Sequence, residues 1–99
     1  MLIRIVKMTF REDKVGDFLQ LFEETKKKIR SFKGCSHLEL LKDINHSNVF
    51  FTYSYWNDES HLDDYRHSDL FEEVWSKTKI LFAEKPAAFS LKKFIEVHK

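Results

Sequence analysis

The spacing of hydrophobic positions changes several times along this chain, and each spacing predicts a different element. Residues 2–10 are dense in Ile, Val, Met and Phe and predict a strand with apolar side chains on both of its faces. Residues 11–14 predict a turn, with Asp13 a candidate helix N-cap. From Val15 to Ile29 the apolar positions recur at helical spacing, with charged positions opposite them, which predicts a helix with one buried face.

A glycine and a polar run mark the connections on either side of the second predicted strand. Gly34 is placed to end the connection after the first helix, because glycine readily adopts the left-handed conformation found at helix ends. Ser36–Asp43 then predicts a strand with Leu38 and Leu40 on one face. The following residues 45–48, Asn-His-Ser-Asn, are typical of a hairpin turn.

The third predicted strand, Val49–Trp56, carries large apolar or aromatic side chains on both faces. One face holds the alternate positions Val49, Phe51, Tyr53 and Tyr55. The other face holds Phe50 and Trp56, around Thr52 and Ser54. A half-exposed strand alternates apolar with polar residues. This strand does not, so we expect both faces of its sheet to be covered, one of them by a second protein surface.

The second helical region is interrupted, which predicts two helical pieces with a kink. Asn57 or Asp58 can cap the first piece, and Ser68 is a candidate cap for the second. Pro86 predicts a loop beyond the helix, because proline is costly in a helix interior. Phe89–Val97 then predicts the last strand. The helical stripe of the second piece is formed by Phe71, Val74, Trp75, Thr78 and Phe82.

This order of elements predicts an α+β fold of the ferredoxin-like βαββαβ type. Its four-stranded antiparallel sheet would carry both helices on one face. The other face, apolar on the first and third strands, would pack against a second copy of the chain. We therefore expect a homodimer with a two-fold interface.

Composition narrows the classes of protein to which the chain can belong. Its 99 residues fit a single domain over residues 1–99, and 42% hydrophobic with 33% charged residues is typical of a folded domain. A formal net charge of +1 gives no field to recruit nucleic acid, and no segment approaches the roughly 20 apolar residues of a membrane span, so we expect neither partner. The first ten residues lack a signal-peptide core and Cys35 is the only cysteine, so a reducing cytoplasmic location is expected.

The chain resembles the antibiotic biosynthesis monooxygenase (ABM) family where the third strand ends. The residues that carry the resemblance are Trp56-Asn57-Asp58-Glu59, then Tyr65, then Ser68-Asp69-Leu70-Phe71. The order of elements and the length agree over nearly the whole chain. The resemblance implies a dimeric α+β barrel, with a cavity between the sheet and the helices of each protomer.

The resemblance also implies a range of activities. Some members of the family oxidise polycyclic aromatic phenols to quinones with O₂ and no cofactor, some degrade haem, and some act on quinones or signalling molecules. Haem-degrading relatives commonly have Asn on strand one, Trp near the kink and His on the last helix, and the corresponding residues here are Lys7, Tyr65 and Trp75. With no imidazole placed to ligate iron, we expect no haem, and no other cofactor.

Candidate catalytic residues are polar side chains on or near the kinked helix. In cofactor-free oxygenation the substrate itself gives an electron to O₂, more easily as a phenolate, so the protein must supply a base or hydrogen-bond donor. Tyr65, His61 and His67 are the candidates. The expected pocket walls are Tyr53, Leu62, Phe71 and Trp75. These rings can equally form ordinary core, and His67 can equally be a solvated loop histidine.

A metal site is not expected. The five histidines lack the i, i+4 spacing of helical zinc ligands. The favoured hypothesis is therefore a cofactor-independent monooxygenase, an oxidoreductase acting on an aromatic or quinone-like small molecule. The alternative is a non-catalytic module of the same fold that binds a small apolar ligand or serves in dimerisation. An open cavity with polar groups would favour the enzyme, and a cavity filled by Trp75 and Phe71 would favour the scaffold.

Overall fold

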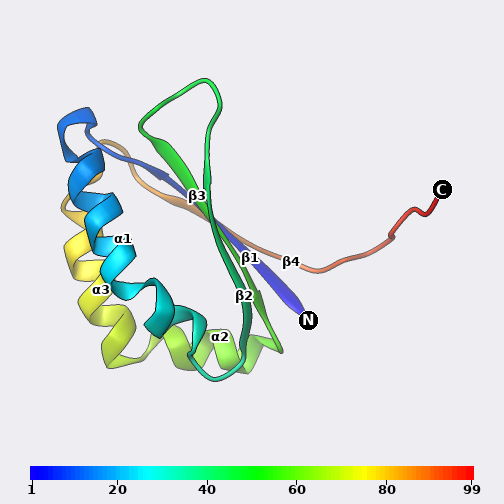
Figure 1. The fold of residues 1–99 in the computed structure, drawn as a ribbon. Helices are drawn as coiled ribbons and strands as arrows, with labels where there is room; N and C mark the ends of the chain where they lie inside the picture. Colours follow the sequence, from blue (N-terminus) through cyan, green and yellow to red (C-terminus); the bar gives the residue numbers. More distant parts are fainter.

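The computed structural model describes residues 1–99 and shows one antiparallel sheet with its helices on a single face (Figure 1). No helix is long and apolar enough to cross a membrane. The elements in chain order are β1 (Leu2–Thr9), the 3₁₀ turn η1 (Glu12–Lys14), α1 (Val15–Arg30), β2 (Cys35–Lys42), β3 (Val49–Trp56), α2 (Glu59–Arg66), α3 (Asp69–Lys79) and β4 (Ala87–Leu91).

The strands lie in the order β2-β3-β1-β4, so the sequence-predicted ferredoxin-like topology is confirmed. The central strand β1 pairs with both β3 and β4, and Arg4 lies opposite Ser54 on one side and Ser90 on the other. Residues directly opposite each other share a face. The helix-covered face of β1 is therefore formed by Leu2, Arg4, Val6 and Met8, while Ile3, Ile5 and Lys7 lie on the open face.

Side-chain caps start the two pieces of the interrupted helix. Asp58 Oδ1 accepts a hydrogen bond from the His61 backbone N–H at 3.2 Å, and Ser68 Oγ accepts one from Phe71 at 3.1 Å. These bonds satisfy donors that have no partner inside a helix. The expected cap at Asp13 is wrong, because Asp13 lies inside η1 and α1 begins two residues later without a side-chain cap.

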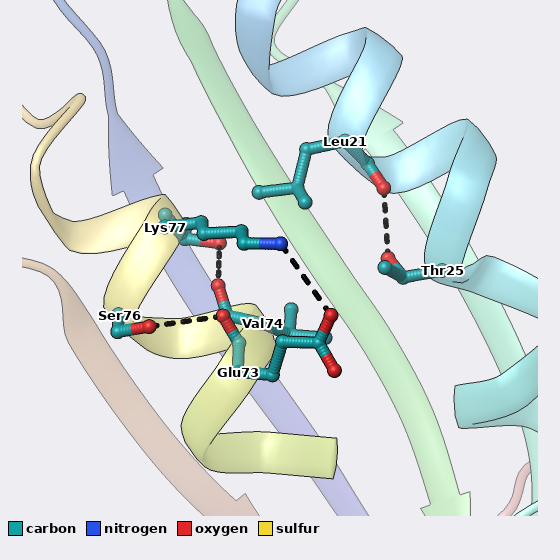
Figure 2. Close-up of polar contacts among 7 residues, drawn as sticks. Leu21, Thr25, Glu73, Val74, Ser76 and Lys77 are labelled. Atoms are coloured by element: carbon teal, nitrogen blue, oxygen red, sulfur yellow. Dashed lines mark hydrogen bonds and ion pairs between the residues drawn. The ribbon is translucent and has the colours of Figure 1, made fainter.

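Helices α1 and α3 contact each other above the sheet. Two threonines in these helices are buried, and each bonds a carbonyl of its own helix: Thr25 Oγ1 donates to Leu21 O at 2.9 Å and Thr78 Oγ1 to Val74 O at 2.7 Å. Figure 2 shows the first of these bonds on α1, opposite Glu73 on α3. Because their hydroxyls are satisfied locally, the helices bury them without a water or a partner from the sheet.

Two buried clusters lie between the helices and the sheet. The first is wholly apolar and consists of Met8, Phe10, Phe18, Phe50 and Leu81, with Phe10 and Phe18 stacked at 4.1 Å between ring centroids. The second consists of Ile29, Cys35, Trp56, Leu62 and Tyr65. The second cluster therefore differs from the first in carrying an indole N–H, a phenol and a thiol.

The last strand is shorter than the sequence predicts. We expected Phe89–Val97, but β4 spans Ala87–Leu91, and residues 92–99 leave the sheet without forming a helix or strand (Figure 1). The reason lies in the pairing: Leu91 is opposite Ile3, and β1 begins at Leu2, so further residues find no strand to pair with. The apolar residues Phe94, Ile95 and Val97 are exposed as a result.

The sheet face away from the helices is left uncovered by the chain itself. It carries Ile3, Ile5, Leu41, Phe51, Tyr53, Tyr55, Phe89 and Leu91. Phe89 and Leu91 are 51% and 48% exposed. The strand pattern that predicted two apolar faces is thus present in the fold, with one face under the helices and the other open.

Candidate functional site

A cavity of about 370 Å³ lies between the helices and the covered face of the sheet. Its volume is in the range of small-molecule sites, which are mostly apolar with a few polar groups. Twenty residues line it, 13 of them hydrophobic. Its aromatic walls are Phe18, Phe22, Trp56, Tyr65, Phe71 and Trp75.

Three of the residues expected to form pocket walls line this cavity. Leu62 is buried on α2, and Phe71 and Trp75 lie one turn apart on α3. The Phe71 and Trp75 rings stack at 5.7 Å between centroids, and Phe71 meets Tyr65 edge-on at 5.2 Å. These contacts hold the rings against the wall and leave the cavity open.

Tyr53 does not line the cavity. It lies on the open face of the sheet, where its hydroxyl is 3.0 Å from the hydroxyl of Tyr55. The strand alternation that groups Tyr53 with Phe51 and Tyr55 excludes it from the face that carries Trp56. The expectation that Tyr53 is a pocket wall is therefore corrected.

Tyr65 belongs to the second buried cluster and lines the cavity. Its ring stacks on Trp56 at 5.1 Å between centroids and contacts Phe32 edge-on. Burial raises the pKa of the Tyr65 hydroxyl well above its usual range, and the neighbouring Cys35 adds to the shift. Tyr65 therefore stays protonated at neutral pH, where it can donate a hydrogen bond but cannot serve as a base.

His67 lines the cavity just after the end of α2. Its Nδ1 is 2.7 Å from the backbone oxygen of Asp63. A carbonyl oxygen only accepts hydrogen bonds, so Nδ1 carries the hydrogen. In the neutral ring, Nε2 is then the unprotonated nitrogen and is able to take a proton.

His61 packs closely against Gly34, outside the cavity. Gly34 has φ 91°, and a Cβ there would lie 2.2 Å from His61 Cγ, so only glycine leaves room for the ring. Asp58 Oδ1 is 3.1 Å from His61 Nδ1, but their geometry makes no hydrogen bond and the buried Nδ1 has no partner. His61 does not line the cavity, so the structure brings together only Tyr65 and His67 of the three candidates.

Sequence reasoning missed the charged residues of the cavity. Arg4 on β1 and Arg66 at the end of α2 line it, together with the hydroxyls of Ser54 and Thr52. A signal was present for Arg4: it is the one charged residue among Leu2, Val6 and Met8, at the parity that faces the helices. A cation on a core-facing parity is an exception to the usual pattern and marks a polar feature.

Hydrogen bonds connect the three neighbouring strands β3, β1 and β4 at the side of the cavity that the sheet forms. The indole Nε1 of Trp56 donates to Ser54 Oγ at 3.0 Å, and Ser54 Oγ donates to Arg4 O at 3.5 Å. Arg4 Nη1 in turn donates to Ser90 Oγ at 2.9 Å. The buried indole is therefore satisfied, and its ring is held in one orientation.

Metal-ligating residues do not gather anywhere in the chain. No three His, Cys, Asp or Glu side chains form a group that could hold an ion. Cys35 is buried and its thiol is 3.5 Å from His37 O. Burial raises the pKa of the Cys35 thiol, so it stays protonated and packs as a small apolar side chain.

Sequence comparison places the chain in a family. The model of the antibiotic biosynthesis monooxygenase (ABM) family matches residues 1–75, from β1 into α3. The chain belongs to this family. The matched region includes Arg4, Tyr65, Arg66 and His67 of the cavity. No curated protein matches the sequence significantly.

Solved structures share the ABM fold with this chain at low sequence identity. A crystal structure of an antibiotic biosynthesis monooxygenase is 18% identical, with a TM-score of 0.90 over 96% of this chain and 100% of the other. A conserved protein from Methanosarcina mazei Go1 is 21% identical, with 0.88 over 95% and 94%. Rv0793 from Mycobacterium tuberculosis is 16% identical, with 0.87 over 98% of both chains. These likenesses establish the fold.

Proposed function

We propose that this ABM protein is a cofactor-independent monooxygenase acting on an aromatic or quinone-like small molecule. The observation that carries the proposal is the open, aromatic-walled cavity that presents both a protonated phenol and an imidazole. Had Trp75 and Phe71 filled this space, a scaffold would have been favoured. Their stacking against the wall leaves room for a flat ring system.

The proposed chemistry draws its electrons from the substrate. A phenol with a hydrogen on the ring carbon para to its hydroxyl can lose the phenolic proton and then pass an electron to O₂. One atom of O₂ is added at that carbon, and the second leaves as water with the hydrogen of that carbon and the hydroxyl hydrogen, which gives a quinone. The atoms and electrons balance with no added reductant.

Two side chains divide the polar work in this proposal. His67 Nε2 is the acceptor for the phenolic proton, because Nδ1 is already held by the Asp63 carbonyl. Tyr65 donates a hydrogen bond to negative charge that develops on the substrate or on reduced oxygen. The aromatic walls hold the ring and exclude water from the buried Tyr65, which strengthens its hydrogen bond to the substrate.

The proposed test measures oxygen consumption and product formation with a panel of polycyclic phenols and quinols. His67→Gln should lower turnover by about a hundredfold or more, in the range of a lost general base. His46→Gln is the matched control, because His46 lies in the hairpin loop and does not line the cavity. If no compound of the panel gave a product, the result would count against an enzyme. Ligand binding without turnover would support the non-catalytic alternative.

The same proposal includes a homodimer formed through the open sheet face. Ile5 lies at the centre of that face, opposite Tyr53 on β3 and Phe89 on β4. This face is largely apolar, with Lys7, His37 and Glu39 as its charged or titratable residues. Such a face on a small domain is typical of an interface, and a second copy would cover it with identical chemistry.

The dimer is tested by sedimentation at micromolar concentration. We expect the unmodified chain to sediment as a dimer and Ile5→Lys to shift it to monomer, since two buried lysines would face each other across the two-fold axis. Leu19→Lys is the control, because Leu19 is 42% exposed on α1, away from the sheet. A monomeric unmodified chain would refute this part of the proposal.

A further inference from the structure

The charges of the cavity are all of one sign. Two guanidinium groups, those of Arg4 and Arg66, belong to its lining, and no Asp or Glu does. The other ionisable lining groups are Tyr65, which is protonated, and His67. The site is thus an aromatic cavity with a cationic part and no internal counter-charge.

Arg4 makes a single side-chain hydrogen bond within the chain. It is half-buried on the helix-covered face of β1, and its guanidinium, which has five N–H donors, makes one hydrogen bond, to the Ser90 hydroxyl. It forms no ion pair, and the neighbouring charge that acts on it is another cation, Arg66. A partly desolvated guanidinium without a carboxylate gains from an anionic partner, because charge-assisted hydrogen bonds are the strong ones.

Arg66 approaches the same cavity from the other layer of the fold. It is the last residue of α2, next to the kink, and its closest acid is Asp63, with Nη1 and Oδ1 4.0 Å apart. That separation lies at the outer limit of an ion pair, and both side chains are about half exposed, so the pair is weak. Arg66 is therefore available to a ligand, and an anion between Arg4 and Arg66 would relieve their mutual repulsion.

We infer that the cavity binds an aromatic carboxylate, with the ring system among the aromatic walls and the carboxylate on the Arg4 and Arg66 guanidiniums. Two guanidiniums can offer a carboxylate parallel N–H donors from the sheet and helix layers together. The inference rests on the proposed use of the cavity as a ligand site, and it adds the substrate class. The carboxylate serves as an anchor, which leaves the oxidisable part of the molecule to Tyr65 and His67.

The test compares binding of two probes of equal size, naphthalene-2-carboxylate and naphthalene-2-carboxamide, followed by tryptophan fluorescence and calorimetry. Neither probe carries a phenol, so binding is measured separately from turnover and stands or falls independently of monooxygenase activity. We expect the carboxylate to bind at least about tenfold more tightly than the amide. Raising the salt concentration should weaken binding of the carboxylate probe and leave binding of the amide probe unchanged.

Variants locate the anchor. Arg4→Gln and Arg66→Gln should each reduce carboxylate affinity about tenfold or more and leave amide affinity within about twofold. Lys7→Gln is the matched control, because it removes a cation from the same strand on the opposite face and should change neither. Arg66 is exposed at a helix end, so its variant tests the inference even if Arg4→Gln is unstable.

Several outcomes would overturn the inference. Equal binding of the two probes, or binding of neither, would show that the cavity does not select an anion. A loss of carboxylate affinity in Lys7→Gln as large as that in Arg4→Gln would show that only the net charge of the protein matters. Loss of both probes in a folded Arg4→Gln or Arg66→Gln variant would assign the arginine to the shape of the cavity and not to the carboxylate.

Discussion

The two buried clusters beneath the helices are built from similar side chains but do different work. The first, around Phe10 and Phe18, contains no polar side chain, and Phe10 within it is fully buried. Both clusters border the cavity, the first through Met8 and Phe18, but only the second, around Trp56 and Tyr65, buries an indole, a phenol and a thiol. We infer from this difference that the first cluster contributes mainly stability, whereas the second buries polar and reactive groups at a cost in stability.

The largest effect should come from breaking the apolar cluster. Phe10→Ala removes a ring that stacks on Phe18 and contacts Phe50 and Phe82, and we expect a loss of about 3–5 kcal/mol in the free energy of unfolding. Urea denaturation measures this loss. Phe94→Ala is the control, because Phe94 is 87% exposed and should change little. Similar losses in the two variants would mean that the apolar cluster is not the stabilising end.

A smaller effect should follow from cutting the polar link in the second cluster. Ser54→Ala leaves the Trp56 indole N–H buried without its acceptor, which should cost about 1–3 kcal/mol. Adding Trp56→Phe to this variant removes the orphaned donor as well, so the two changes should be non-additive in urea denaturation. Additive losses would show that the hydrogen bond contributes nothing and that only packing holds Trp56.

The smallest effect at neutral pH should be that of Tyr65→Phe, because the Tyr65 hydroxyl makes no hydrogen bond within the chain. Above its ordinary pKa of 10.0, however, the unfolded chain releases the Tyr65 proton while the folded chain keeps it. Unfolding then becomes more favourable by up to about 1.4 kcal/mol per pH unit. The variant lacks this term, so its stability should fall less steeply than that of the unmodified chain between pH 10 and 11. Parallel curves would indicate that Tyr65 titrates normally.

Much of the fold could be predicted from the chain because local pattern and tertiary structure agree. Val49–Trp56 has the bounds that its composition predicts, and Ser68 caps the second helical piece as its position before the apolar stripe suggests. The end of β4 could not be predicted, because it is set by where the partner strand β1 begins and not by the composition of residues 92–97.

The site was harder to predict because it depends on contacts between layers. Tyr65 and His67 could be proposed from the kink, but the position of His61 outside the cavity depends on how α2 packs against the connection that contains Gly34. The position of Tyr53 on the open face of the sheet could be predicted from strand alternation alone. Arg4 could be recognised in the sequence as a charge among core-facing positions. That it shares the cavity with Arg66, at the end of α2, is seen only in the structure.

The contact between Gly34 and His61 also constrains how the chain can change over generations. A side chain at position 34 would collide with the base of the His61 ring, and φ 91° would strain any residue other than glycine there even beside a smaller residue 61. Position 61 can change to a smaller residue without either conflict. Because Tyr65 and Arg66 lie on α2 only a turn beyond His61, a side chain forced in at position 34 would press on the helix that carries part of the cavity. Related sequences with a large residue at position 61 should therefore keep glycine at position 34.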